Sequence, residues 1–94
     1  MERRGSVTKS ELGRELIVRA PEIQGGEPVI RGTRVPVRSI VLSHRYDYSG
    51  NADAVAAAYD VDVAAVEAAL AYYREHKAEI DDIIDRNERA AHEV

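Results

Sequence analysis

The chain of 94 residues contains no cysteine, no tryptophan and no phenylalanine, and it has a single methionine. The absence of cysteine excludes a disulfide framework and any thiolate metal site. The hydrophobic core must therefore consist of Val, Ile, Leu, Ala and the five tyrosines. Because a domain of this size buries only about 60–70% of its unfolded surface, this composition favours a homodimer or a bound partner. The alternative is a marginally stable monomer.

Long apolar runs are also absent. No stretch reaches the roughly 18 consecutive apolar residues that a membrane-spanning helix needs, and no hydrophobic signal segment is present. We therefore expect a protein that does not interact with membranes and is located in the cytoplasm.

Charge is divided unevenly along the chain. Residues 1–45 carry nine basic and five acidic side chains, a balance of +4, whereas residues 46–94 carry four basic and twelve acidic ones, a balance of −8. A positive half joined to a negative half suits a protein with two different partners. The alternative is a polar surface with no electrostatic function.

Turn-forming residues concentrate between residues 25 and 38. Two short β-prone runs, Pro28-Val29-Ile30 and Thr33-Arg34-Val35, flank Gly32. This pattern predicts extended backbone folded over a tight turn that requires a positive φ at the glycine. The run Leu16-Ile17-Val18-Arg19 predicts a short strand that pairs with one arm of this hairpin, and Pro36 is typical of the first turn of a helix.

The hairpin segment also carries a family resemblance. Its sequence, GGEPVIRGTRVPV, resembles the signature of domain-of-unknown-function family 433, a family of small bacterial proteins. The resemblance extends from about Ile17 to Tyr73. It implies a VapB-like antitoxin of a type II toxin–antitoxin pair. Such a protein is a dimer that neutralises a PIN-like ribonuclease toxin and binds operator DNA to repress its own operon.

Hydrophobic periodicity predicts three helices after the hairpin. The first covers residues 37–45, the second covers residues 52–59 with Asn51 as its N-cap, and the third begins after Asp62. Three consecutive helices, the last two joined by a three-residue turn, are typical of a helix-turn-helix domain.

In the third helix, a stripe of positions spaced alternately by three and four residues runs from Val63 to Ala91 without proline or glycine. Its members are apolar except for Lys77 and Asn87. This stripe predicts one continuous helix over residues 63–90, whose second half projects as an acidic arm that leaves Ile80, Ile83 and Ile84 exposed. Two i, i+4 ion pairs, Asp82–Arg86 and Asp85–Arg89, are expected to support this arm. We therefore divide the chain into a mobile basic arm (1–15), a hairpin and tri-helical domain (16–75) and a helical extension (76–94). The predicted fold is mainly α, with a small N-terminal β-hairpin, a helix-turn-helix (homeodomain-like) core and a long C-terminal helix.

The arginines in and after the hairpin are the best candidates for a nucleic-acid contact, because guanidinium groups match phosphate oxygens and guanine edges. The predicted DNA-binding residues are Arg31, Thr33, Arg34, Arg38 and Arg45. The alternative is that Arg31 and Arg34 brace the fold by pairing with Glu27 or with acids of a neighbouring helix. We favour the DNA role for Arg38 and the structural role for Arg34.

The helix that would normally enter the DNA groove is acidic. It begins with Asp62, continues to Glu67, and has no Arg, Lys, Asn or Gln in its first ten positions. Both carboxylates would repel phosphate. We therefore expect the helix-turn-helix to act as a scaffold, with any DNA contact made by the hairpin and the basic arm.

The favoured function is a non-enzymatic, antitoxin-like regulator that binds a PIN-like toxin through its C-terminal helix and operator DNA through its N-terminal half. The predicted partner-binding residues are Tyr73, Lys77, Ile80, Ile83, Ile84 and Asn87. The alternative is a protein-interaction or dimerisation module without DNA binding. The three histidines are scattered, and the carboxylates at 81, 82 and 85 are typical of a solvated helix face. We therefore expect no catalytic residue, metal or cofactor.

Overall fold

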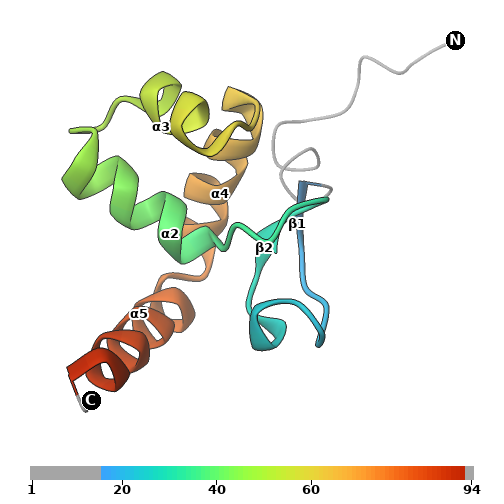
Figure 1. The fold of residues 1–94 in the computed structure, drawn as a ribbon, viewed down its shortest axis with the longest axis vertical. Coiled ribbons are helices and arrows are strands. Elements are labelled where there is room, and N and C mark those ends of the chain that lie inside the picture. Colours follow the sequence, from blue (N-terminus) through green and yellow to red (C-terminus); the bar gives the residue numbers. More distant parts are fainter. Residues whose placement is uncertain (1–15, 93–94) are drawn as a thin grey trace, which may run out of the picture.

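The computed structural model describes residues 16–92 of the chain (Figure 1). Its elements, in chain order, are β1 (Ile17–Val18), β2 (Val29–Ile30), α2 (Val37–Leu42), α3 (Ala52–Tyr59), α4 (Val63–Glu75) and α5 (Lys77–His92). This order confirms the mainly α fold with a small N-terminal hairpin and a tri-helical core. The basic arm predicted for residues 1–15 lies outside the described residues.

The two strands form an antiparallel pair, in which Ile17 lies opposite Ile30 and Val18 lies opposite Val29. After β2 the chain reverses at Gly32, whose φ of +79° is easily adopted only by a residue without a Cβ. The N–H of Ile30 then donates to the carbonyl of Val35 at 2.9 Å. The strand and the glycine turn are therefore both present as predicted.

The three helices of the core begin where the sequence predicts. Pro36 is the N-cap of α2, and the Asn51 side chain caps α3 by accepting the N–H of Ala54 at 3.0 Å. Asp62 is the N-cap of α4, although its side chain makes no capping hydrogen bond. After Leu42, α2 continues as one π-helical turn over Ser43–Asp47. Alanines, the strongest helix formers, dominate α3 and much of α4.

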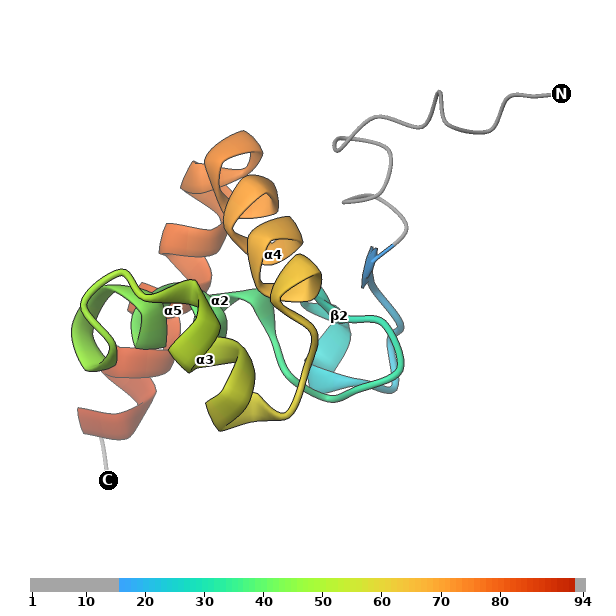
Figure 2. The same cartoon turned by 90° about the horizontal axis from the view of Figure 1, so that it is seen from above.

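One hydrophobic core joins the helices to the hairpin. Ile40 of α2, Val55 of α3 and Val66 of α4 are fully buried, and Ile17 and Ile30 of the two strands belong to the same cluster. Seen from above, α2, α3 and α4 surround this centre and the hairpin lies at one side of it (Figure 2). The hairpin is thus held by the same apolar contacts that hold the helices.

The continuous helix predicted over residues 63–90 is wrong. α4 ends at Glu75, His76 has non-helical backbone angles (φ −129°, ψ 40°), and α5 starts at Lys77. The helix axis changes direction there, and α5 runs below α2 (Figure 1).

The predicted exposure of three isoleucines is wrong for the same reason. Ile80 and Ile83 are 0% and 8% exposed, and Ile84 is partly buried against the core. Burial of these two side chains contributes about 3–6 kcal/mol, whereas the three backbone hydrogen bonds lost at the break cost about 3 kcal/mol. Breaking the helix to bury these residues is therefore favourable. No helix within residues 16–92 combines the length and the apolar character needed to cross a membrane.

Candidate nucleic-acid interface

The tip of the hairpin presents two arginines to solvent. Arg31 and Arg34 are both exposed, and neither forms an ion pair with any other residue in the range 16–92. The Gln24 side chain fixes the backbone at this point by donating to the carbonyl of Arg34 at 3.0 Å. The hairpin therefore holds the backbone of both arginines in place while their side chains stay on the surface.

Thr33 has a structural role in the turn. Its hydroxyl donates to the carbonyl of Ile30 at 2.8 Å and accepts the N–H of Val35 at 3.0 Å. Both hydrogen bonds close the turn between the two arms of the hairpin. The hydroxyl predicted to contact phosphate is thus engaged inside the protein, and the DNA contact of Thr33 stays a prediction.

A groove of about 420 Å³ separates the hairpin from the helix-turn-helix. The hairpin contributes Arg31 and Thr33 to its walls, and the other side includes Ala57 and the turn from Asp60 to Asp62. This turn joins α3 to α4. The hairpin arginine therefore lies beside the end of α4 that enters the DNA groove in proteins with this fold.

The α4 side of the groove is acidic, as the sequence indicates. Asp60 and Asp62 are not buried, and Glu67 lies exposed on the first turns of α4. Asp60 adopts a left-handed conformation (φ +57°) as the C-cap of α3. A phosphate that approaches this groove would meet the guanidinium of Arg31 and the carboxylates of the turn together. The hairpin side would attract the phosphate, and the α4 side would repel it.

Arg38 forms an ion pair on α2. Its Nε donates to the Glu27 oxygens at 3.0 and 3.2 Å, and the two side chains are only 22% and 12% exposed. The sequence allowed a pairing with Glu27 for the hairpin arginines, and in the structure Arg38 makes it. It ties the Gly25-Gly26 turn to the start of α2, and the DNA role predicted for Arg38 remains untested.

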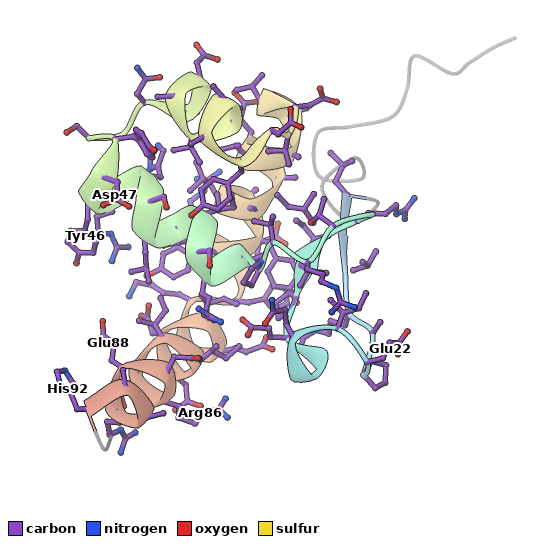
Figure 3. All side chains as sticks on the ribbon, viewed as in Figure 1. Glu22, Tyr46, Asp47, Arg86, Glu88 and His92 are labelled. Carbon is purple, nitrogen blue, oxygen red and sulfur yellow. The ribbon has the colours of Figure 1, made fainter. Side chains whose placement is uncertain are left out.

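Arg45 lies away from the hairpin, in the π-helical turn that follows α2. Its guanidinium lies 5.7 Å from the ring centres of both Tyr46 and Tyr73 and donates to the Tyr73 hydroxyl at 3.3 Å. Figure 3 shows Tyr46 at the end of α2 that lies opposite the hairpin. The five predicted DNA-binding residues are therefore not gathered at one place, and only Arg31 and Thr33 share a groove.

The polar contacts of Arg45 continue into a cluster at the junction of α4 and α5. The Tyr73 hydroxyl donates to Asp81 at 2.7 Å, and the Lys77 ammonium bonds the other Asp81 oxygen at 2.7 Å. Lys77, with a smaller contribution from Tyr73, holds the pKa of the Asp81 carboxyl below its usual value. The same carboxylate raises the pKa of Lys77. This cluster links α2, α4 and α5.

A second cluster lies around the same junction. Arg19, just after β1, donates to the Tyr72 hydroxyl at 2.8 Å and forms an ion pair with Glu79 of α5. The ring of Tyr72 stacks on His76 with the ring centres 4.1 Å apart. Glu79 is also the main cause of the raised pKa of Arg19. The sequence alone did not predict these links, because Arg19 and Glu79 are 60 positions apart in the chain.

The remaining predicted partner-binding residues lie along α5. Asn87 donates from its side chain to the carbonyl of Ile83 at 2.8 Å. On the outer face, Arg86 pairs with Asp82 at 3.0 Å and Arg89 with Asp85 at 2.5 Å, which confirms the two predicted i, i+4 pairs. Arg86, Glu88 and His92 project outward in Figure 3. Much of the acidic charge of α5 is therefore neutralised by its own arginines.

No set of three or more His, Asp or Glu side chains within residues 16–92 is placed to hold a metal ion. Taken together, the fold and the candidate site define a tri-helical helix-turn-helix domain that carries a basic hairpin beside the turn between its last two core helices.

Comparison with known proteins identifies the family. Residues 17–73 match the family described as protein of unknown function (DUF433), and the chain belongs to this family. The matched stretch runs from β1 into α4 and ends three residues before the break at His76. A crystal structure of a DUF433 member protein from Anabaena variabilis shares the fold, with a TM-score of 0.64 and 23% sequence identity. The match covers 86% of this chain and 88% of that one. No curated protein matches this chain.

Proposed function

We propose that this protein is an antitoxin-like regulator whose hairpin, and not its recognition helix, contacts the DNA backbone. The observation that carries the proposal is the position of Arg31 and Arg34. Both are exposed at the tip of the hairpin without an ion-pair partner in the part of the chain that the structure describes. Arginines that lack a carboxylate partner are ready to bind phosphate oxygens without first breaking an internal contact.

The position of the hairpin supports this assignment. Arg31 borders the groove beside the α3–α4 turn, so a duplex approaching the helix-turn-helix from its usual side would meet the hairpin at the same time. The hairpin would then supply the positive charge that the start of α4 lacks.

A gel-shift assay with the DNA upstream of the gene tests the proposal. We expect R31A/R34A to lose at least about tenfold in affinity, because two charge-assisted contacts are removed. The matched control is R86A/R89A, which changes the net charge by the same amount on the outer face of α5 and should bind like the wild type. Equal losses in both double variants would contradict a role for the hairpin.

The acidic wall of the groove provides a second test. Asn replaces Asp at residues 60 and 62 without disturbing the helix ends, because Asn tolerates the left-handed conformation and serves as an N-cap. If DNA lies against this groove, D60N/D62N should bind more tightly than the wild type by several-fold. Unchanged affinity would place the DNA elsewhere on the protein.

The antitoxin half of the proposal concerns a protein partner, a PIN-like ribonuclease toxin. In the described conformation the available part of α5 is its outer face, which carries Asp82, Asp85 and Glu88. These carboxylates suit a basic RNA-binding cleft. We expect D82N/D85N/E88Q to retain much less of the toxin encoded by the neighbouring gene in a co-purification experiment. R86Q/R89Q, which leaves the acids, should retain at least as much as the wild type.

A second candidate function is a protein-interaction module with no DNA binding. The acidic turn between α3 and α4 favours it, since Asp60 and Asp62 line the groove that would face the duplex. Absence of any shift with the upstream DNA at low salt would support this candidate over the first.

A further inference from the structure

A single residue separates α4 from α5. His76 alone lies outside helical geometry. Its N–H still donates to the carbonyl of Tyr72 at 2.9 Å, and its own carbonyl accepts the N–H of Ile80 at 3.0 Å. Helical hydrogen bonding therefore resumes within one turn on each side, and His76 is a hinge between two helices of 13 and 16 residues.

The sequence on either side of the hinge is patterned for one helix. The spacing of three and four residues, apolar except at Lys77, passes from Tyr73 to Ile80 without a shift in phase. No glycine or proline marks the break. If residue 76 adopted helical angles, residues 63–92 would form a helix of about 45 Å, at about 1.5 Å per residue.

The broken form leaves backbone groups without partners. The N–H groups of Lys77, Ala78 and Glu79 open α5 and find no acceptor among residues 16–92. In a straight helix these three groups would donate to the carbonyls of residues 73, 74 and 75. Straightening the hinge therefore restores hydrogen bonds but removes Ile80 and Ile83 from the core that they cover.

A second copy of the chain can provide the lost cover. The docking contacts of α5 are those of Ile80 and Ile83 with the core, the ion pair of Glu79 with Arg19 and the bond of Asp81 with Tyr73. The apolar contacts of Ile80 and Ile83 and the ion pair of Glu79 can form in the same way on another copy of the chain. Exchange of an identical element between protomers is a low-cost route to a dimer, and short hinges favour it.

We propose that α5 exchanges between two copies of this chain. The hinge at His76 straightens in each copy, and each α5 then packs on the α2 and α4 surface of the other. The exchanged pair buries both sets of isoleucines, pairs Glu79 of one copy with Arg19 of the other, and gains the backbone bonds that the hinge lacks. The proposal concerns how two copies associate and does not depend on DNA or toxin binding.

Chemical cross-linking tests the exchange directly, because the natural chain has no cysteine. A size-tagged R19C chain is mixed with an E79C chain at high concentration and treated with a short bismaleimide. Exchange places the two cysteines of different chains together, so the expected product is a tagged–untagged dimer. A D53C chain mixed with E79C is the control for random collisions, since Asp53 lies exposed on α3.

A yield for R19C with E79C well above the control supports the exchange. If the R19C/E79C double variant cross-links only within one chain, while the mixed single variants give no more product than the control, the exchange is overturned. A dimer seen by light scattering without the R19C–E79C product would likewise overturn it.

Two hinge variants provide an independent readout. H76A and H76G both lose the stacking on Tyr72, but alanine favours a continuous helix and glycine favours a break. With two hinges in each dimer, we expect the dimer dissociation constant of H76A to be roughly 15- to 30-fold lower than that of H76G. Sedimentation equilibrium measures the dimer dissociation constant of each variant. Equal constants for the two variants would contradict the proposal, and so would monomers at every concentration.

Discussion

The hairpin and α5 are attached to the same core by different means. The hairpin is held through its backbone and buried strand residues, so its exposed arginines contribute little to its shape. α5 is held by side chains alone, through two isoleucines and the clusters around Arg19 and Tyr73. The first arrangement presents charges on a fixed support. The second is a helix that one non-helical residue, His76, joins to the end of α4.

The largest expected effect concerns the α5 side of this comparison. Ile80→Ala removes a fully buried side chain and should destabilise the fold by about 2–5 kcal/mol in urea unfolding. Ile84→Ala is the matched control on the same helix and should cost clearly less, because Ile84 is only partly buried. Equal losses for both variants would mean that α5 does not dock through Ile80.

The hairpin side depends on the hydroxyl of Thr33. Thr33→Val keeps the shape but leaves the carbonyl of Ile30 and the N–H of Val35 without this partner, which should cost about 1–3 kcal/mol in urea unfolding. Thr33→Ser retains the hydroxyl and should stay near wild-type stability. A Val variant as stable as the Ser variant would show that the turn does not need these bonds.

A smaller effect separates the two classes of arginine. Arg38→Met breaks a partly buried ion pair and leaves Glu27 without its partner, which should cost about 1–2 kcal/mol. Arg31→Met should stay within about 0.5 kcal/mol of the wild type, because no described residue pairs with it. The same loss of stability in both variants would contradict the distinction between Arg38, which braces the fold, and Arg31, whose side chain is exposed.

The smallest effect is the pH dependence of the Asp81 contact. The pKa of this carboxyl is lower in the folded chain than its usual value, so its stabilising contribution is present above about pH 4. The contribution is lost as the pH falls through the folded pKa. We expect Asp81→Asn to be less stable than the wild type at pH 7, with a difference that shrinks as the pH falls below about 4. A difference that does not shrink at all below about pH 4 would exclude this cause.

The parts of the fold that depend on local chemistry could be predicted from the sequence. Gly32 specifies the hairpin turn and Asn51 caps the start of α3, because turns and helix ends need particular residue types at particular positions. The signature that identified the family consists largely of such residues. The glycines and prolines of the signature are therefore explained by the backbone conformations that the turns and the start of α2 require.

The break at His76 could not be predicted, because nothing near it disfavours a helix. Its cause is the apolar surface that Ile80 and Ile83 cover, which exists only once α2 and α4 have packed. The pairing of Arg38 with Glu27 also depends on the folded turn. In the candidate site, sequence reasoning found Arg31 and Arg34, but it could not tell exposed arginines from those used in bracing.

The salt dependence of DNA binding tests most directly whether the hairpin binds DNA phosphates. Each neutralised phosphate contributes about −0.9 to the slope of log affinity against log salt. We predict a steep negative slope for the wild type and a slope flatter by about 2 for each bound chain of R31A/R34A. The same slope in both proteins, or no salt dependence in the wild type, would contradict the claim.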